Sequence, residues 1–436
     1  MANVLITPVE VVKESLAILH TNNVFIKGID KQYSKEFAVS GGKIGSTINV
    51  REPNRGTIRK GAVMQGGSVV ETYVPLTLTT QWGTDVSFST AELTLSLDDF
   101  SKRILQPRIA RLASQLDLDG MQGMVTGTFP AGTGLTPAIR PVYNVVGTPG
   151  TTPGTGGGSA TGLAQYNAPI VFLNAGMMLD NFATPRDENR SMILNPSAHA
   201  SSVSGLSGLF NPQKTVGEQY RKGVLGNALG FEFAMDQNVY ALTLGTRVAT
   251  GGTLYSAIVD GSASIALNHS GTVVAGDKFT VEGVYSVNPE TQQSTGQLQQ
   301  FVITAAATLS GTQAVTVAPT PILTGATVAN GTVTTATGAF DGSSTGGAAA
   351  SPIIFVGAAS TVTPCNLAYH QDAFTFGTAD MEMPGGVDFA ARESFEGISM
   401  RVIRAYDIGS DQLPCRVDIL GGFAALRREL ACIVAG

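Results

Sequence analysis

The chain has 436 residues, of which 43% are hydrophobic and only 14% are charged, and its formal net charge is −6. Because a typical globular protein has about 25% charged residues, much of this surface must be uncharged. Such a surface suits subunits that partners cover, since interface cores are poor in charge, and it also suits secreted β-rich proteins. The acidic balance argues against a nucleic-acid-binding protein that neutralises phosphates with a basic stripe.

Length and cysteine content set further bounds. At about 150 residues per domain, the length predicts roughly three structural units. The chain has an odd number of widely spaced cysteines, namely Cys365, Cys415 and Cys432. We therefore expect no disulfide framework. Free thiols fit a reducing cytoplasm. The N-terminus shows no basic region followed by an apolar core, and no run of about 18 apolar residues occurs, so neither a signal peptide nor a membrane span is expected.

The first predicted element is a helix in "ITPVEVVKESLAILH" (residues 6–20). Thr7 is a candidate cap, Pro8 suits the first helical position and Glu10 completes a capping box. Its apolar stripe comprises Val9, Val12, Leu16 and Leu19. The helix either packs on its own domain or forms an arm that docks on a neighbour or an assembly factor. Lys13 and Glu14 lie off the stripe and are candidate contacts for such an arm.

Residues 44–90 change to a strand period. Two strand patterns flank a polar, Gly-rich middle, which predicts a long hairpin. One face of the second strand is apolar and comprises Val70, Thr72, Val74, Leu76 and Leu78; the other comprises Glu71, Tyr73, Thr77 and Thr79. An isolated hairpin is marginal in water, so we expect a neighbouring subunit to cover the apolar face. The middle carries a charged group that is either a solvated turn or a contact with that neighbour: Arg51, Glu52, Arg55, Arg59 and Lys60.

Residues 97–125 show the longest helical pattern and predict a spine helix. Asp98 or Asp99 is a candidate cap, and Pro107 should kink or restart the helix. The repeating apolar positions are Leu105, Ile109, Leu112 and Leu116. Residues 126–162 are rich in Gly, Thr and Pro and predict a long, partly flexible loop.

The second half of the chain alternates between two patterns. Residues 163–242 predict mixed α/β structure, with a strand, a turn at Asn195-Pro196 and a small helix. Residues 245–355 hold only seven charged residues, and their short alternating segments predict a small antiparallel barrel or sandwich. Within it, "KFTVEGVYSV" (278–287) is interpreted as a short hairpin that turns at Glu282-Gly283. From about residue 360, we expect strands and a Pro-Gly-Gly turn. The chain then closes with a strand, Gly421-Gly422 and a short helix or strand.

A search for chemistry finds no catalytic constellation. The phosphate-binding G-x-x-x-x-G-K-[ST] and the nucleophile motif G-x-S-x-G do not occur. The four histidines His20, His199, His269 and His370 are isolated. "DLDG" (117–120) matches only the start of a calcium loop, and we interpret it as the end of the spine helix, where Gly120 permits the turn. We therefore expect no catalytic, cofactor-binding or metal-binding residue and no enzyme activity.

The order of these elements resembles the major capsid (coat) protein of tailed bacteriophages, in the short-tailed-phage branch with an inserted β-barrel domain. "GDKFTVEGV" (276–284) looks like the entry to that barrel, and "PCRVDILGGFAALRRELACIVAG" (414–436) looks like the family's closing segment. The resemblance implies an α+β Hong Kong-97-type phage capsid fold with an N-arm, an extended hairpin loop, a spine helix, and peripheral and axial domains. The implied division is 1–36 N-terminal arm, 37–90 hairpin loop, 91–162 spine helix and peripheral domain, 163–244 first part of the axial domain, 245–355 inserted barrel, and 356–436 return through the axial and peripheral domains.

The resemblance also implies a function and partners. The chain would self-assemble into hexamers and pentamers of an icosahedral head shell in the virion, after assembly in the host cytoplasm. It would work with a scaffolding protein, a portal protein and a decoration protein, and would enclose double-stranded DNA without sequence-specific contact, with no membrane involved.

Two rival functions stay open at this stage. A secreted surface-layer or adhesin-like β protein is favoured by low charge and abundant Thr and Gly, and disfavoured by the two helices and the missing signal peptide. A glycan-processing enzyme with the insert as a binding module is disfavoured because no convincing acid pair exists and Trp82 is the single tryptophan.

Overall fold

The computed structural model describes residues 8–31, 47–52, 61–63, 73–89, 106–130, 138–147, 169–206, 225–259, 261–291, 293–321, 351–387 and 389–435. Within them, the helices are α1 (Pro8–Asn22), α4 (Gln106–Thr126), α6 (Pro169–Asn181) and α7 (Pro196–Leu206), with short 3₁₀ turns η1 (Ile26–Gly28), η3 (Gln371–Ala373) and η4 (Arg428–Leu430). Strands form several sheets and a barrel, so the expected mixed α+β class with an inserted barrel is confirmed.

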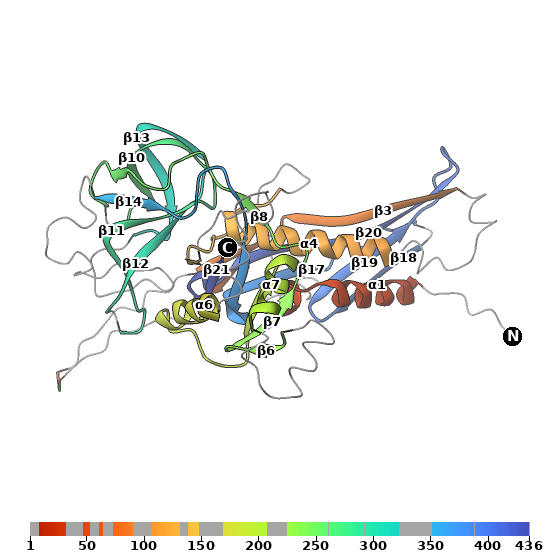
Figure 1. The fold of residues 1–436 in the computed structure, drawn as a ribbon. Coiled ribbons are helices and arrows are strands. Elements are labelled where there is room, and N and C mark those ends of the chain that lie inside the picture. The colour runs from red at the N-terminus through yellow and green to blue at the C-terminus, as the bar shows by residue number, and fades with distance from the viewer. Residues whose placement is uncertain are drawn as a thin grey trace.

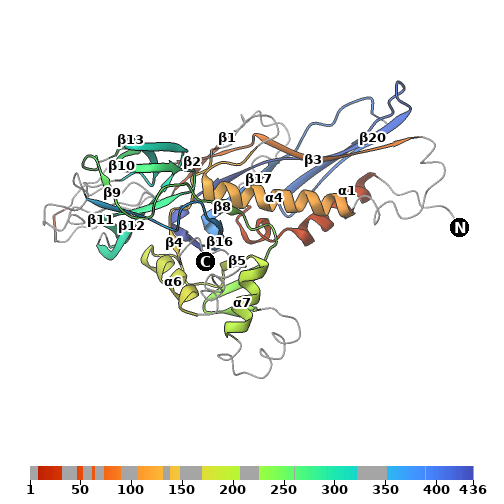
Figure 2. The same cartoon turned by 45° about the horizontal axis from the view of Figure 1, so that its top comes forward.

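One end of the molecule is a five-stranded antiparallel sheet backed by two helices. Its strands are β3 (Thr80–Ser89), β17 (Phe374–Ala379), β18 (Phe389–Phe395), β19 (Ile398–Arg404) and β20 (Gln412–Ala425). Helices α1 and α4 lie side by side along this sheet (Figures 1 and 2). The stripe residues Val12, Leu16 and Leu19 of α1 are buried in the core that the helices share with the sheet. The N-terminal helix therefore packs on its own chain, the first of the two expected alternatives.

The centre of the molecule is a six-stranded sheet in the order β4-β21-β16-β5-β7-β6. Its strands are β4 (Val145–Val146), β5 (Arg190–Leu194), β6 (Asn227–Ala228), β7 (Phe231–Met235), β16 (Asn366–His370) and β21 (Ala431–Val434). Helix α6 packs on this sheet and buries Phe172, Ala175 and Leu179. The expected strand, Asn195-Pro196 turn and helix are confirmed as β5 and α7, and the terminal segment proves to be a strand.

The insert closes into a barrel in the strand order β10-β13-β12-β11-β14-β9, seen at the upper left of Figure 1. The strands are β9 (Gly252–Leu254), β10 (Ser264–Val273), β11 (Lys278–Val287), β12 (Ser294–Ile303), β13 (Ala307–Ala318) and β14 (Pro352–Phe355). All lie within the expected 245–355. The rings of Phe279, Phe301 and Phe355 meet in its apolar interior. A two-stranded sheet of β8 (Ala241–Thr243) and β15 (Val362–Pro364) joins the chain on either side of the insert.

Three local predictions were wrong. Residues 278–287 form one strand, β11, rather than a hairpin, because Glu282 and Gly283 form a bulge in its pairing with β12, with Gly283 at φ 79°. Helix α4 does not end at "DLDG" but continues to Thr126. The loop expected at 126–162 contains the edge strand β4.

Some predictions concern residues outside the described part of the chain. These are the cap at Thr7, the cap at Asp98 or Asp99, and most of the loop at 126–162. Helix α4 is described from Gln106, so Pro107 lies in its first described turn. The residues before it, which a kink or restart at Pro107 would involve, lie outside the described part of the chain. No helix in the described ranges is long and apolar enough to cross a membrane.

Candidate functional site

The root of the long hairpin is a pair of short strands, β1 (Thr47–Arg51) and β2 (Tyr73–Thr77). The predicted faces are correct for the described residues, since Val74 and Leu76 are buried and Tyr73 is exposed. Their cover, however, comes from the same chain. The buried cluster at the root comprises Ile48, Val50, Val74, Leu76, Ala424 and Leu426. The expectation that a neighbouring subunit covers this face was therefore wrong for the root.

Gly422 makes this close approach possible. A Cβ atom added at Gly422 would lie 2.0 Å from the carbonyl oxygen of Thr77, so no side chain fits between β20 and β2. Gly377, its partner on β17, would place a Cβ 2.9 Å from the Leu76 side chain. The two glycines form a flat seat for the hairpin root. In the sequence, Gly421-Gly422 follows a predicted strand, and no local pattern indicates that the hairpin root packs there.

Charged residues at the root are tied to the subunit itself. Glu52 accepts a hydrogen bond from Arg140 at 2.5 Å, and its side chain is only 7% exposed. The carboxylate of Glu52 is thus held within its own chain, and its predicted role as an inter-subunit contact stays a prediction. Arg51 is exposed on β1, whereas Arg55, Arg59 and Lys60 lie outside the described residues.

A buried charged cluster lies close to this ion pair. Arg428 lies over the ring of Tyr143, 5.6 Å from its centroid, and both residues are buried together with Glu429. Burial and, as a smaller cause, the positive charge of Arg140 lower the pKa of Arg428 to about 10. The hairpin root, the 138–147 segment and the chain's closing segment thus meet at one charged junction.

The N-terminal segment is fastened to the spine helix by Asp117. Its carboxylate accepts hydrogen bonds from the backbone N–H groups of Val24 (2.7 Å), Phe25 (3.4 Å) and Ile26 (3.2 Å). Burial raises the pKa of Asp117 to about 7, while the three N–H groups act in the opposite direction. Lys13 and Glu14 are both exposed on α1, so they stay available as candidate contacts.

Asp119 fastens the strand that follows the hairpin. It accepts hydrogen bonds from the indole Nε1 of Trp82 at 2.8 Å and from Gln115 at 2.6 Å. Gly120 permits close packing, since a Cβ there would lie 2.9 Å from both Phe25 and Phe423. "DLDG" therefore binds two distant segments to the spine rather than ending it, which the helical pattern alone could not show.

The neck of the insert holds its few charges. Arg247 and Asp277 are fully buried and form an ion pair at 3.3 Å. Arg247 also donates to the carbonyl oxygens of Val356 and Gly357 at 2.9 Å each. Asp277 accepts from the N–H of Val274 at 2.9 Å. These contacts join both chain crossings between the barrel and the body.

The barrel also completes the edge of the central sheet. Gln300 on β12 accepts from the N–H of Val145 at 2.5 Å and donates to its carbonyl oxygen at 2.9 Å. Val302 and Ala318 of the barrel share a buried cluster with α6. The insert is a separate sheet structure, but it shares part of its packing with the body.

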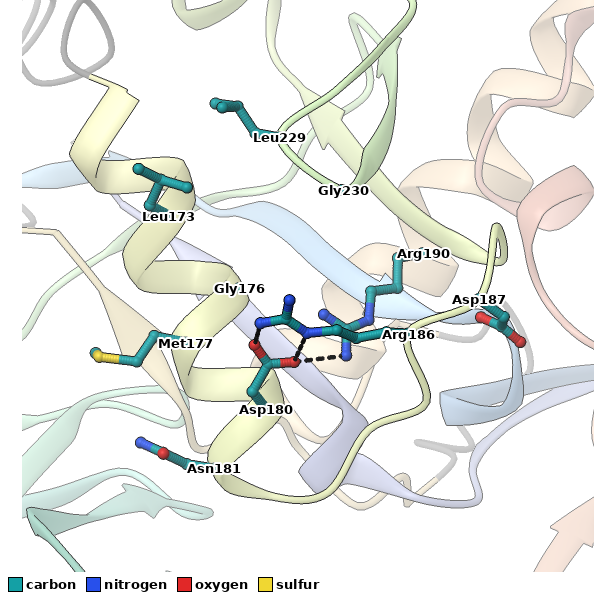
Figure 3. A pocket seen from close by; sticks show the side chains of 10 residues that line it. All are labelled: Leu173, Gly176, Met177, Asp180, Asn181, Arg186, Asp187, Arg190, Leu229 and Gly230. Carbon is teal, nitrogen blue, oxygen red and sulfur yellow. Dashed lines mark hydrogen bonds and ion pairs between the residues drawn. The ribbon is translucent and has the colours of Figure 1, made fainter.

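A pocket of about 390 Å³ lies between α6, the loop that follows it and the turn between β6 and β7. Figure 3 shows Asp180 facing Arg186, with Arg190 close by. Asp180 accepts hydrogen bonds from both arginines, at 3.0 Å from Arg186 Nε and 2.8 Å from Arg190 Nη2. Among the described residues, no group of three His, Cys, Asp or Glu side chains is placed to hold a metal ion.

Each end of the elongated body carries a strongly exposed apolar side chain. At one end, residues 61–63 are exposed, and Val63 is 81% exposed. At the other end, the loop between β19 and β20 projects (Figures 1 and 2) and carries Ile408, which is 87% exposed. Asp407 orders this loop by accepting from the Gly409 N–H at 2.9 Å and the Ser410 hydroxyl at 2.7 Å.

Comparison with solved structures gives distant matches to phage particles. The capsid of Ralstonia phage GP4 matches with 9% identity and a TM-score of 0.46, covering 94% of this chain and 86% of that chain. A structure of Mycobacterium phage Che8 matches with 10% identity and a TM-score of 0.44, covering 94% of this chain and 90% of that chain. No curated protein matches. With scores this low, family membership rests on a sequence match.

That match is to the family model described as P22 coat protein, gene protein 5, and it spans residues 171–434. The matched segment contains α6, α7, the central sheet from β5 onward, the whole barrel and the closing strands, so it covers more than half of the chain. The rival function of a secreted surface-layer protein is set aside. The chain belongs to the P22 coat protein family and is a phage major capsid protein that forms the shell of the virion head.

Proposed function

We propose that the chain builds its lattice by reaching neighbouring copies from both ends of its body. The hairpin is the observation that supports this proposal. Its root is seated on the subunit at Gly422 of β20. Residues 61–63 lie exposed at the other end of the body (Figure 1). A seated root and an exposed end suit an arm that is rigid at one end and reaches a neighbour at the other. Head-to-tail contacts of this kind generate rings of one chain.

The charged residues beyond the root are proposed contacts. Arg55, Arg59 and Lys60 would meet acidic groups of the neighbour, helped by Arg51 at the root. Each exposed ion pair contributes about 0–1 kcal/mol, so apolar burial at about 25 cal/mol per Å² must supply most of the stability. Lys13 and Glu14 would add contacts along α1, and Ile408 would add an apolar contact at the opposite end.

The remaining partners belong to the same proposal. During assembly in the host cytoplasm, a scaffolding protein and a portal protein would assist the chain without being required for it to form particles, and a decoration protein would bind the finished shell. Packaged double-stranded DNA would be enclosed without base-specific contact, since the chain is acidic. The chain would act as a structural protein, with no enzyme activity, in hexamers and pentamers.

Charge reversal tests the arm. We expect Lys60→Glu, and more strongly the double change of Arg55→Glu and Arg59→Glu, to reduce particle yield while the subunit stays folded. Lys27→Glu is the matched control, since Lys27 is exposed on η1 outside the hairpin. Yield is measured by sedimentation and electron microscopy, and folding by circular dichroism. Normal yield from all arm variants would remove the proposed role of these charges.

A further inference from the structure

Helix α6 is apolar on both sides. Its inner side is buried against the central sheet through Phe172, Ala175 and Leu179. Its outer side exposes Ile170, Leu173 and Met177, at 56%, 48% and 41%. These three positions share one helix face, and a helix that is apolar all round is typical of one buried on every side. Within the part of the chain that the structure describes, the outer face of α6 lacks the cover that its composition predicts.

The exposed face contains a notch of the shape that helix packing requires. Leu173, Gly176, Met177 and Asp180 occupy positions i, i+3, i+4 and i+7 of α6 and line the pocket described above. Four residues with this spacing form the hole that receives a side chain from a partner. Gly176 deepens the hole because it has no side chain, and the turn at Leu229-Gly230 forms the facing wall (Figure 3).

The polar end of the notch is already satisfied. Asp180 is paired with Arg186 and Arg190, so its charge is compensated within the subunit. Arg190 also donates to the carbonyl oxygens of Thr184 and Pro185, at 2.7 and 2.8 Å. A small ionic ligand would have to break these pairs. The notch therefore suits an uncharged, apolar side chain.

Backbone strain at the rim is an independent observation. Leu229 has φ 51°, in the left-handed region that favours glycine, and it precedes Gly230 at φ 83°. Leucine rarely adopts this conformation, and such strain tends to persist where a function requires it. Here it places a leucine on the wall of the notch opposite Leu173 and Met177.

We propose that the outer face of α6 is an interface in which the notch receives an apolar side chain from a second copy of this chain. The inference deepens the proposed function and rests on it. A second copy is the occupant because the chain belongs to a coat protein family and forms its shell from copies of itself, and because the exposed face beside the notch, formed by Ile170, Leu173 and Met177, suits an apolar protein surface rather than DNA phosphates. Among the described residues, the subunit's own barrel meets the exposed side of α6 toward its C-terminal half, where Asn288 donates to the Asn181 carbonyl at 3.0 Å and Gln297 contacts Met177 at 3.6 Å.

The contact is one part of a larger lattice interface. Stable interfaces bury about 800 Å² per partner, which is more than three side chains and a notch provide. A head-to-tail contact also needs no two-fold symmetry. We therefore expect the notch to orient neighbouring subunits during assembly rather than to form a dimer by itself.

Filling the notch tests the inference. In Gly176→Leu, the new Cβ meets only an ordinary contact, 3.7 Å from the ring of Phe231, so the subunit can fold. We expect assembly of the purified chain to slow by about tenfold or more, as when an interface anchor is lost. Ala200→Leu places the same leucine side chain at an exposed position of α7 and should assemble like the wild type. Assembly of Gly176→Leu at the wild-type rate would overturn the inference while leaving the proposed function intact.

Labelling in assembled particles provides the second measurement. In Met177→Cys, a maleimide should react with the new thiol in the free subunit and at least about tenfold more slowly in particles of the purified chain, because interface cores exclude water. Equal rates would overturn the inference. Protection that appears only when another protein is added would also overturn it, since the occupant would then not be a second copy. If the wild type formed no particles at all, the proposed function would fail together with the inference.

Discussion

The inserted barrel and the body of the subunit bury their charges in different ways. In the barrel, the interior is apolar and the buried charges sit at the neck, where Arg247 pairs with Asp277. In the body, Asp117 and Asp119 lie inside the core on the spine helix and accept hydrogen bonds from neutral N–H groups. The ion pair joins two neighbouring chain crossings, whereas the carboxylates join segments that are far apart in sequence. The buried ion pair of the barrel lies at its neck, whereas the buried carboxylates of the body lie along its spine helix.

Breaking the neck should have the largest effect. In Asp277→Ala, Arg247 stays buried without its partner, which costs about 3–5 kcal/mol. We expect a separate early unfolding transition of the barrel in urea, followed by circular dichroism. Glu282→Ala removes an exposed carboxylate from the same barrel and is the matched control. An unfolding curve identical to that of the control would show that the neck ion pair does not fix the insert.

The spine carboxylate should respond to pH. The pKa of Asp117 is raised by burial to about 7 in the folded chain, whereas an aspartate in the unfolded chain ionises near pH 4. The folded chain therefore binds the Asp117 proton more tightly than the unfolded chain does. The stability that this proton contributes is complete below about pH 4 and is lost as the pH rises through about 7. Over that range the free energy of unfolding falls by at most about 1.4 kcal/mol per pH unit. Asp117→Asn should flatten this dependence.

The measurement is the free energy of unfolding of both chains in urea at pH 5 and pH 8. We expect the wild type to lose more stability than Asp117→Asn between these two values. Asp119→Asn serves as a comparison on the same helix, since burial also raises the pKa of Asp119. An equal pH dependence for the wild type and Asp117→Asn would contradict the assignment of this proton to Asp117.

The hairpin seat should give a smaller effect. In Gly422→Ala, the new Cβ would clash with the Thr77 carbonyl at 2.0 Å, and the neighbour is backbone that cannot rotate away. We expect a loss of about 1–3 kcal/mol, as for overpacking, and faster proteolysis at the hairpin root. Gly377→Ala is the control, because it meets the flexible end of Leu76 and should cost less. If the two variants behaved alike, close backbone approach at Gly422 would not explain the glycine.

The features that the sequence predicted share a local cause. The stripe of α1, the Asn195-Pro196 turn and the alternating strands of the barrel depend on residues close together in the chain, so periodicity and turn chemistry identify them. The missed features are pairs of distant residues. Nothing local brings Glu52 to Arg140 or Gln300 to Val145.

"DLDG" shows how a local rule can mislead. Glycine is common just after the last turn of a helix, but Gly120 lies inside α4, where Phe25 and Phe423 pack against it. The seat at Gly422 and the notch at Gly176 follow the same physics, since each glycine makes room for a partner that only the fold brings close. The resemblance to coat proteins supplied the order of the domains, and the charged arm contacts stay predictions.

Electron microscopy of the purified wild-type chain over a range of concentrations should reveal whether the hairpin reaches a neighbouring copy. We expect rings and closed shells, with residues 61–63 of each subunit against a neighbouring copy and the root still seated on its own β20. A chain that stayed monomeric at every concentration, with the whole arm folded on its own body, would contradict it.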